Sequence, residues 1–262
     1  MRGVGTLSQG KGHDWASLES GRMKTSTIVA LIGVCAALAS APALSATSTA
    51  TPAPAPTAAP PMSASERQFV GSVTKDLQSR FATQAAATAA GYFRYTDEDD
   101  TGAISWVNTK YWASDQQHPS QLWYDVNGRL IGADWSVLQT TSPKAPTVWG
   151  ISASRWLDFS PAHVHFGVKT PSGVQYGAAG SKTWSKIGSL EHPTSAEVVK
   201  LATMPRWKVL KIPAPETPDD VAFVFEFPAL WDLQVWLVPN PLGAFAEHNP
   251  NVTPSAAAKH QD

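Results

Sequence analysis

The sequence predicts an α+β domain in which a mostly antiparallel, curved β-sheet or partial barrel packs against an N-terminal amphipathic helix and one further short helix. Three observations predict this class. Apolar residues recur at helical spacing after Ser63, an Asn-Gly turn separates two strand-like runs, and further runs rich in aromatic and branched residues follow. A single globular domain over 63–252 is the natural division, because a chain of this length can bury a sufficient core.

The N-terminal helix is predicted from a cap and a stripe. Ser63 and Glu66 have the spacing of a capping box, and we expect the helix to end by Gly91. Behind the cap, apolar side chains recur every four residues along one face, which is typical of core packing: Phe69, Val73, Leu77, Phe81 and Ala85.

The further helix is predicted over 194–204. Thr194 and Glu197 repeat the capping-box spacing, and Pro205 ends the helix. Val198, Leu201 and Ala202 give it an apolar face.

The clearest β-hairpin joins 121–126 to 129–135 through Asn127-Gly128, the dipeptide most typical of a two-residue hairpin turn. Side chains alternate along a strand, so Trp123 and Trp135 are expected on opposite faces of this hairpin.

Three more strand predictions follow along the chain. A second hairpin joins 163–170 to 174–177 around Pro171-Ser172-Gly173, and two dense apolar runs at 221–227 and 233–238 are typical of strands.

Residues 23–46 have the layout of a secretory signal peptide. Lys24 supplies the positive end, 28–39 the apolar core and Ala41-Pro42-Ala43 a small-residue cleavage site. Residues 1–22 lack these features and are interpreted as a non-native upstream extension. We therefore expect export to the periplasm or the extracellular space.

The apolar core of this segment holds only about a dozen strongly apolar residues, whereas a membrane-spanning helix needs roughly 20. Val34 precedes Cys35, where lipidation requires a small residue. No stable membrane anchor is expected after cleavage, and a cleaved chain contains no cysteine, which excludes disulfides and thiol chemistry.

Composition predicts a linker before the domain and a tail after it. Residues 47–62 are rich in Pro, Ala and Thr and are predicted to be an extended linker, while 253–262 are predicted to be a disordered tail. The part after Met62 has 16 basic and 19 acidic residues and no Lys/Arg run, so nucleic acid is not an expected partner.

The pair His163 and His165 is the most suggestive chemical motif. On a strand both imidazoles lie on one face, with Val164 on the other, and could share a divalent transition metal with a third ligand. The candidates for that ligand are His118, Glu226 and His248. The His-x-His pair is similar to that of the cupin family, but the glutamate that follows it in cupins is missing here. The alternative is a solvent-facing or hydrogen-bonded histidine pair on the polar side of a hairpin, without metal.

Acidic residues offer two weaker patterns. The run 97–102 is similar to a calcium-binding turn but has no glutamate at its end, which favours a solvated turn. Asp125 and Asp134 could form a carboxylate pair near one hairpin face, although two such acids are more often surface residues. Neither a Gly-x-Ser-x-Gly elbow nor a phosphate-binding glycine loop occurs.

Aromatic residues are the main compositional bias. Ten of the eleven tryptophans lie after the signal segment, where they could fill a core or stack on a ligand. The ligand-binding candidates are Trp106, Trp112, Trp123, Trp135 and Trp236.

The C-terminal segment reads Trp236-Leu237-Val238-Pro239, followed by Asn240-Pro241-Leu242-Gly243-Ala244-Phe245-Ala246-Glu247-His248-Asn249-Pro250. It resembles the closing segment of uncharacterised exported bacterial proteins, in which a tryptophan-bearing strand runs into Asn-Pro-x-Gly-x-Phe-Ala-x-x-Asn-Pro. The resemblance implies export and a bacterial origin, with no known activity.

Three functions remain open. The first is a non-catalytic domain with an aromatic-lined pocket for a small-molecule ligand, which the strand and aromatic patterns favour. The second is a metal-binding protein or metalloenzyme that uses His163 and His165. The third is an envelope interaction protein without a small ligand.

Overall fold

The computed structural model describes residues 57–258, and its first element is the predicted N-terminal helix. Helix α1 spans Ala64–Arg80 and is capped as expected, because Ser63 Oγ accepts from Glu66 N and the Glu66 carboxylate accepts from Ser63 N. The helix is shorter than predicted. Thr83 Oγ1 accepts from Ala86 N and starts a separate helix, α2 (Gln84–Ala89).

The larger sheet has six strands in the order β1-β2-β3-β4-β9-β5, and every neighbouring pair is antiparallel. Its strands are β1 (Phe93–Glu98), β2 (Ile104–Val107), β3 (Gln121–Tyr124), β4 (Leu130–Leu138), β5 (Leu157–Phe159) and β9 (Leu230–Trp236). The predicted hairpin joins β3 to β4, but its turn runs from Asp125 to Gly128, where Gly128 N donates to Asp125 O. Gly128 has a positive φ of 77° and Asn127 does not, so a longer loop replaces the predicted two-residue turn.

The smaller sheet has the order β7-β6-β8 and is also antiparallel. Its strands are β6 (His163–Thr170), β7 (Gly173–Gly180) and β8 (Val221–Phe227). The second predicted hairpin is thus confirmed. Short helices follow: α3 (Ser181–Trp184), α4 (Ser195–Ala202) and α5 (Trp207–Leu210), with 3-10 turns at Thr109–Tyr111, Ala153–Arg155 and Pro218–Asp220.

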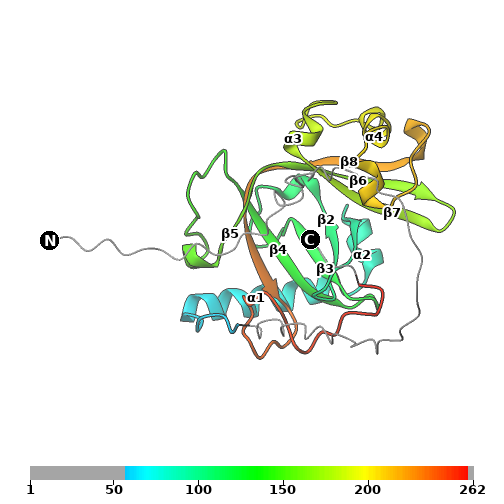
Figure 1. The fold of residues 1–262 in the computed structure, drawn as a ribbon. Helices are drawn as coiled ribbons and strands as arrows, with labels where there is room; N and C mark the ends of the chain where they lie inside the picture. Colours follow the sequence, from blue (N-terminus) through cyan, green and yellow to red (C-terminus); the bar gives the residue numbers. More distant parts are fainter. Residues whose placement is uncertain (1–56, 259–262) are drawn as a thin grey trace, which may run out of the picture.

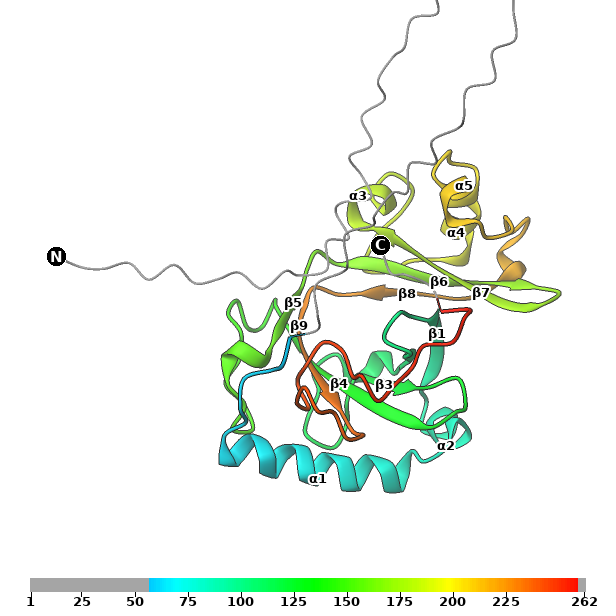
Figure 2. The ribbon, with the colours of Figure 1, turned by 60° about the horizontal axis from the view of Figure 1, so that its bottom comes forward.

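The two sheets face each other, and helices cover both outer faces (Figure 1, Figure 2). Helix α1 packs on the larger sheet through a core that includes Phe69, Leu77 and Trp135. Helices α3, α4 and α5 pack on the smaller sheet around Phe166. A third apolar cluster, which includes Tyr95 and Phe227, lies between the sheets.

The predicted α+β class with mostly antiparallel strands is confirmed, but the single curved sheet or partial barrel is wrong, because the strands form two sheets that do not close into a barrel. Only Pro228 and Ala229 separate β8 from β9, yet these strands belong to different sheets. The described residues also hold several short helices in place of the one predicted, and β9 begins three residues before the predicted strand at 233–238.

The predicted upstream extension 1–22 and signal peptide 23–46 lie outside the described residues, as do positions 47–56 of the linker and 259–262 of the tail. Residues 253–258 are described and lie against β1, where Ser255 N donates to Glu98 Oε1 over 2.8 Å. Within residues 57–258, no helix has the length and apolarity needed to cross a membrane.

Candidate functional site

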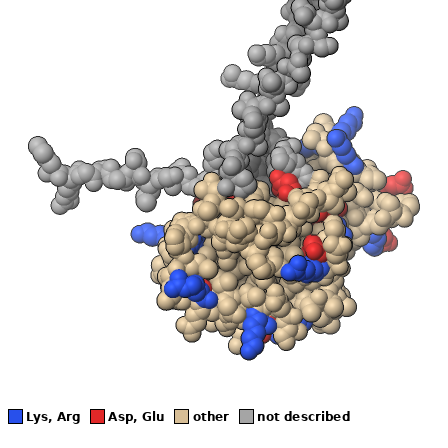
Figure 3. All heavy atoms as spheres, turned by 90° about the horizontal axis from the view of Figure 1, so that it is seen from below, with Lys and Arg blue, Asp and Glu red and all other residues tan. Residues whose placement is uncertain are grey.

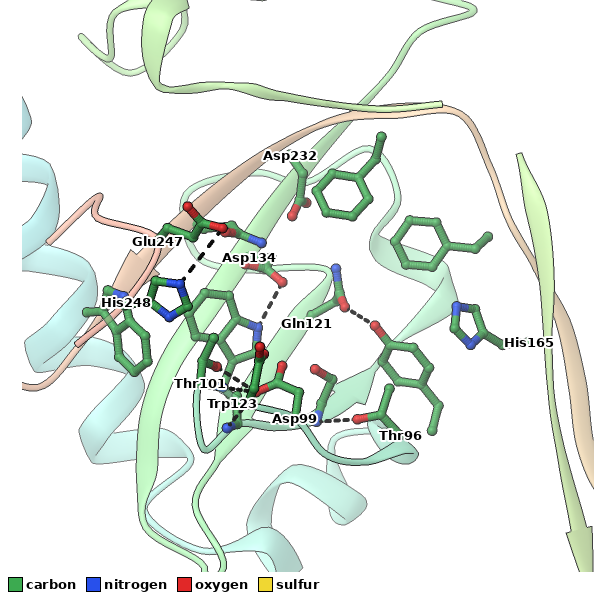
Figure 4. Close-up of a pocket in the computed structure, with 18 of the residues that line it drawn as sticks. Thr96, Asp99, Thr101, Gln121, Trp123, Asp134, His165, Asp232, Glu247 and His248 are labelled. Carbon is green, nitrogen blue, oxygen red and sulfur yellow. Dashed lines mark hydrogen bonds and ion pairs between the residues drawn. The ribbon is translucent and has the colours of Figure 1, made fainter. Parts of the chain in front are cut away.

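A pocket of about 260 Å³ opens between the two sheets, on the face of the larger sheet that points away from α1 (Figure 4). The larger sheet supplies mainly polar and tryptophan side chains, and the smaller sheet supplies the two histidines and Phe227. Loops at either end add acidic groups. The residues that line the pocket include Tyr95, Asp99, Asp100, Gln121, Trp123, Asp134, Phe159, His163, His165, Phe227, Asp232, Gln234, Trp236, Glu247 and His248.

Strand alternation places two aspartates on the pocket face of the sheet. Asp134 on β4 pairs with Gln234 on β9, and Ser136 pairs with Asp232, so the two aspartates occupy diagonal positions on one face. The intervening residues, Trp135 and Leu233, point to the α1 core. Two carboxylates therefore meet inside a region that is buried on both sides.

Each of these carboxylates has one satisfied and one unsatisfied oxygen. Asp134 Oδ2 accepts from Trp123 Nε1 over 2.8 Å, and Asp232 Oδ1 accepts from Ser136 Oγ over 3.0 Å. Asp134 Oδ1 and Asp232 Oδ2 are buried and accept no hydrogen bond from the described residues. The residues are only 3% and 1% exposed, respectively.

Burial and mutual repulsion change the acidity of the pair. Burial raises the pKa of Asp232 to about 7. Burial, with the Asp232 charge second, raises the pKa of Asp134 well above its usual value. The pair therefore binds protons more readily than an ordinary pair of carboxyl groups, and any cation that approached it would compete with those protons.

Trp123 is held against the sheet by a glycine. A Cβ on Gly132 would lie only 2.1 Å from the Trp123 ring, so only glycine leaves room for the ring across β4. The ring also makes an edge contact with Trp236, with centroids 5.4 Å apart. The indole that donates to Asp134 is thus fixed on two sides.

The opposite wall carries the two predicted histidines. His163 Nε2 and His165 Nε2 are 3.1 Å apart, and both residues are buried. His163 stacks on Phe227 and His165 stacks on Phe225, with centroid distances of 4.8 and 5.6 Å. Burial lowers the pKa of His163 and lowers that of His165 well below its usual value, so both imidazoles are neutral at pH 7.

Tyr95 connects the two walls. Its hydroxyl donates to Gln121 Oε1, and its ring makes an edge contact with His165 at 4.8 Å. Burial raises the pKa of Tyr95 well above its usual value, so the hydroxyl keeps its proton.

Acidic groups also lie at the ends of the pocket. Asp99 Oδ1 accepts from Thr101 Oγ1 over 2.6 Å and from the amides of Thr101 and Ala103, which folds the predicted acidic turn inward. Burial raises the pKa of Asp99. On the other side, Glu247 Oε1 lies 3.9 Å from His248 Nε2 (Figure 4).

The predicted metal ligands are brought together only in part. His163, His165 and His248 line the same pocket. His118 lies elsewhere, stacked on Tyr111 and paired with Asp115 over 2.8 Å. Glu226 pairs with Val164, so it lies on the helix-covered face of the smaller sheet and points away from the pocket. Within the described part of the chain, no group of three or more His, Cys, Asp or Glu side chains could hold a metal ion.

Of the five tryptophans predicted to bind a ligand, only two line the pocket. Trp123 and Trp236 line the pocket. Trp106 and Trp135 pack in the core beneath α1, and Trp112 packs on Phe227 with centroids 4.9 Å apart. The alternation of the first hairpin therefore placed Trp123 and Trp135 on opposite faces as predicted.

The sequence reasoning missed the main partner of Asp134. Asp125 lies in the hairpin turn, where it accepts from the amides of Asn127 and Arg129, and the partner is Asp232. A signal was present. Asp232 and Gln234 alternate with Trp231, Leu233 and Val235, which places a polar row along one face of an otherwise apolar strand.

Comparisons of the chain with protein-family models, with curated proteins and with solved structures found no match.

Proposed function

We propose that this protein binds a small ligand that donates hydrogen bonds, and that the ligand occupies the pocket between the two sheets. One observation carries the proposal: Asp134 and Asp232 line the pocket, and Asp134 Oδ1 and Asp232 Oδ2 are buried without a hydrogen-bond partner among the described residues.

The two oxygens without partners are energetically costly in the unliganded protein. A buried acceptor without a partner costs about 1–3 kcal/mol, and more when the group is charged. Native proteins keep few such groups, and those that remain call for an explanation such as a ligand or a catalytic role. A ligand with two donors would remove both costs at once, which gives the pocket a built-in preference for it.

The shape and lining of the pocket agree with this proposal. Sites for drug-sized ligands have about 300–1,000 Å³, so a pocket of about 260 Å³ suits a smaller molecule. Trp123 and Trp236 offer apolar ring surface, while Gln121 and Gln234 offer further polar contacts. The signal-like segment before the domain supports a place of action outside the cytoplasm, which we include in the proposal.

The proposal is tested by screening small polar compounds of all charge types against the purified protein, with thermal shift and tryptophan fluorescence as readouts. Trp123 hydrogen-bonds to Asp134, so its emission should respond to occupancy. Variants Asp134→Asn and Asp232→Asn should lose the response. The matched control is Asp125→Asn, because Asp125 lies in an exposed turn outside the pocket.

Compounds that bind wild type and the control but not the pocket variants would support the proposal. If compounds bind equally to all four proteins, or none bind, the proposal fails and an interaction role without a small ligand is favoured.

A further inference from the structure

We infer that the ligand is a small organic cation whose nitrogen carries N–H donors, such as an alkyl amine or a guanidine. This inference rests on the proposed function and names the ligand class for the same pocket. It follows from the charges that line the pocket, from the two unsatisfied oxygens and from the aromatic rings beside them.

Acidic side chains outnumber basic ones on the pocket wall. Five acidic residues line it: Asp99, Asp100, Asp134, Asp232 and Glu247. None of the described lining residues is lysine or arginine. By contrast, the molecular face on the α1 side shows basic and acidic side chains dispersed over a mostly uncharged surface (Figure 3). An anion entering the pocket would be repelled, and a cation would be attracted more strongly than in water because the surroundings are buried.

The imidazoles of His163 and His165 supply no positive charge that would offset the acidic groups. His163 and His165 face the pocket from the smaller sheet, where each packs against a phenylalanine ring. Their burial favours the neutral form. His248 lies on the other side of the pocket beside Glu247, away from His165 (Figure 4). The Asp134–Asp232 pair therefore has no cationic side chain next to it from either sheet among the described residues.

The two unsatisfied oxygens select among cations. Asp134 Oδ1 and Asp232 Oδ2 are acceptors in diagonal positions on adjacent strands, so a group with several N–H donors could bond to both. Hydrogen bonds between ionised partners are roughly twice as strong as those between neutral ones. A quaternary ammonium ion lacks these donors and would leave both oxygens unsatisfied.

Aromatic rings complete a site for a cation. Trp123 and Trp236 lie on the larger sheet beside the carboxylates, and Tyr95, Phe159 and Phe227 line the remaining wall. The faces of such rings attract ammonium and guanidinium groups. A neutral polyol could also donate hydrogen bonds, but it supplies no opposite charge to the carboxylates when they ionise.

The test is isothermal titration calorimetry at pH 8 with matched probes. Butane-1,4-diamine and agmatine are the cations with N–H donors, butane-1,4-diol is the neutral analogue of the diamine, tetramethylammonium is a cation without donors, and succinate is the anion. We expect at least one amine to bind, with the diol, tetramethylammonium and succinate each weaker by about tenfold or more.

Variants locate the site. Asp232→Asn should weaken amine binding by about tenfold or more, and Asp125→Asn should not change it. Asp134 also accepts from Trp123, so Asp134→Asn could disturb folding. The wild-type probe series and Asp232→Asn decide the question without it.

The remaining outcomes contradict the cation inference, the proposed function or both. If the diol or tetramethylammonium binds as tightly as the amines, or the amines bind equally to Asp232→Asn, the cation inference is wrong. If none of these probes binds but a neutral compound from the screen binds in a carboxylate-dependent way, the cation inference is wrong and the proposed function stands. If nothing binds in either experiment, both are wrong.

Discussion

Asp134 on β4 and Asp232 on β9 lie diagonally across two antiparallel strands, and each has one oxygen bonded within the protein and one oxygen without a partner among the described residues. This relationship connects the fold to the proposed function. Alternation on two central strands brings both carboxylates to the inner face, and the second sheet buries them.

The first prediction concerns stability and pH. The raised pKa of Asp232, about 7 against a usual value of 3.8, means that its contribution to stability is fully present below about pH 4 and is lost as pH rises through 7. The free energy of unfolding of the wild type should therefore fall as pH rises from 4 to 8. Asp232→Asn removes the ionisation, so the variant should become more stable than wild type as pH increases.

Urea unfolding of both proteins at intervals from pH 4 to pH 8 measures this difference. Curves of unfolding free energy that stay parallel over the whole range would show that Asp232 ionises as freely in the folded protein as in the unfolded chain.

The second prediction concerns the glycine beneath Trp123. Gly132→Ala forces the indole off β4, breaks its hydrogen bond to Asp134 and should cost about 1–3 kcal/mol of stability, with a shift in tryptophan emission. Gly71→Ala is the matched control. An added Cβ at Gly71 meets nothing within 4 Å, and Gly71 is an exposed position in the middle of α1, so this change should stabilise by about 0.5–1 kcal/mol. Equal effects of the two substitutions in thermal unfolding would contradict the tight contact.

The third prediction concerns the buried ion pair that holds the start of α1. Arg155 Nε lies 3.1 Å from Glu66 Oε1, and the two side chains are 6% and 4% exposed. Glu66→Gln leaves Arg155 buried without its partner and should cost about 3 kcal/mol. Asp76→Asn breaks a more exposed i,i+4 pair with Arg80 and should cost less than about 0.5 kcal/mol.

The same ion pair predicts a loss of stability in acid. Its hydrogen bonds from Arg155 lower the pKa of Glu66 to about 2, so the stabilisation is present above the usual pKa of 4.5 and is lost as pH falls toward 2. Urea unfolding at pH 7 and pH 3 should therefore show a smaller difference between wild type and Glu66→Gln at the lower pH. A difference that does not change with pH would contradict this.

The fourth prediction concerns metal. The described residues offer His163 and His165 no third ligand, so elemental analysis should find no near-stoichiometric zinc, iron, copper or manganese in the protein purified without a His tag. A His163→Ala, His165→Ala double variant should give the same result. Near-stoichiometric metal that disappears in this variant would instead support the metal-binding alternative.

Local patterns predicted much of the secondary structure. The strand at 221–227 has its predicted bounds as β8, and the capping boxes at Ser63 and Thr194 both start helices. These elements are determined by neighbours in sequence. The division of β8 and β9 between two sheets depends on contacts between distant residues, which periodicity does not encode.

Only those features of the site that depend on neighbours in sequence could be predicted. Alternation identified the shared face of His163 and His165 and the opposite faces of Trp123 and Trp135. The pairing of Asp134 with Asp232 requires the register between β4 and β9, which are almost 100 residues apart in the chain, and no local pattern gives that register.

The most direct test of the central claim is the affinity for butane-1,4-diamine, measured by calorimetry at pH 6, 7 and 8. The diamine stays protonated over this range, whereas the raised pKa of Asp232, about 7, means that a cation must displace a proton at lower pH. Affinity should therefore be lower at pH 6 than at pH 8, and Asp232→Asn should bind weakly throughout. Affinity that is independent of pH, or that is unchanged in the variant, would contradict the claim that this carboxylate pair binds the cation.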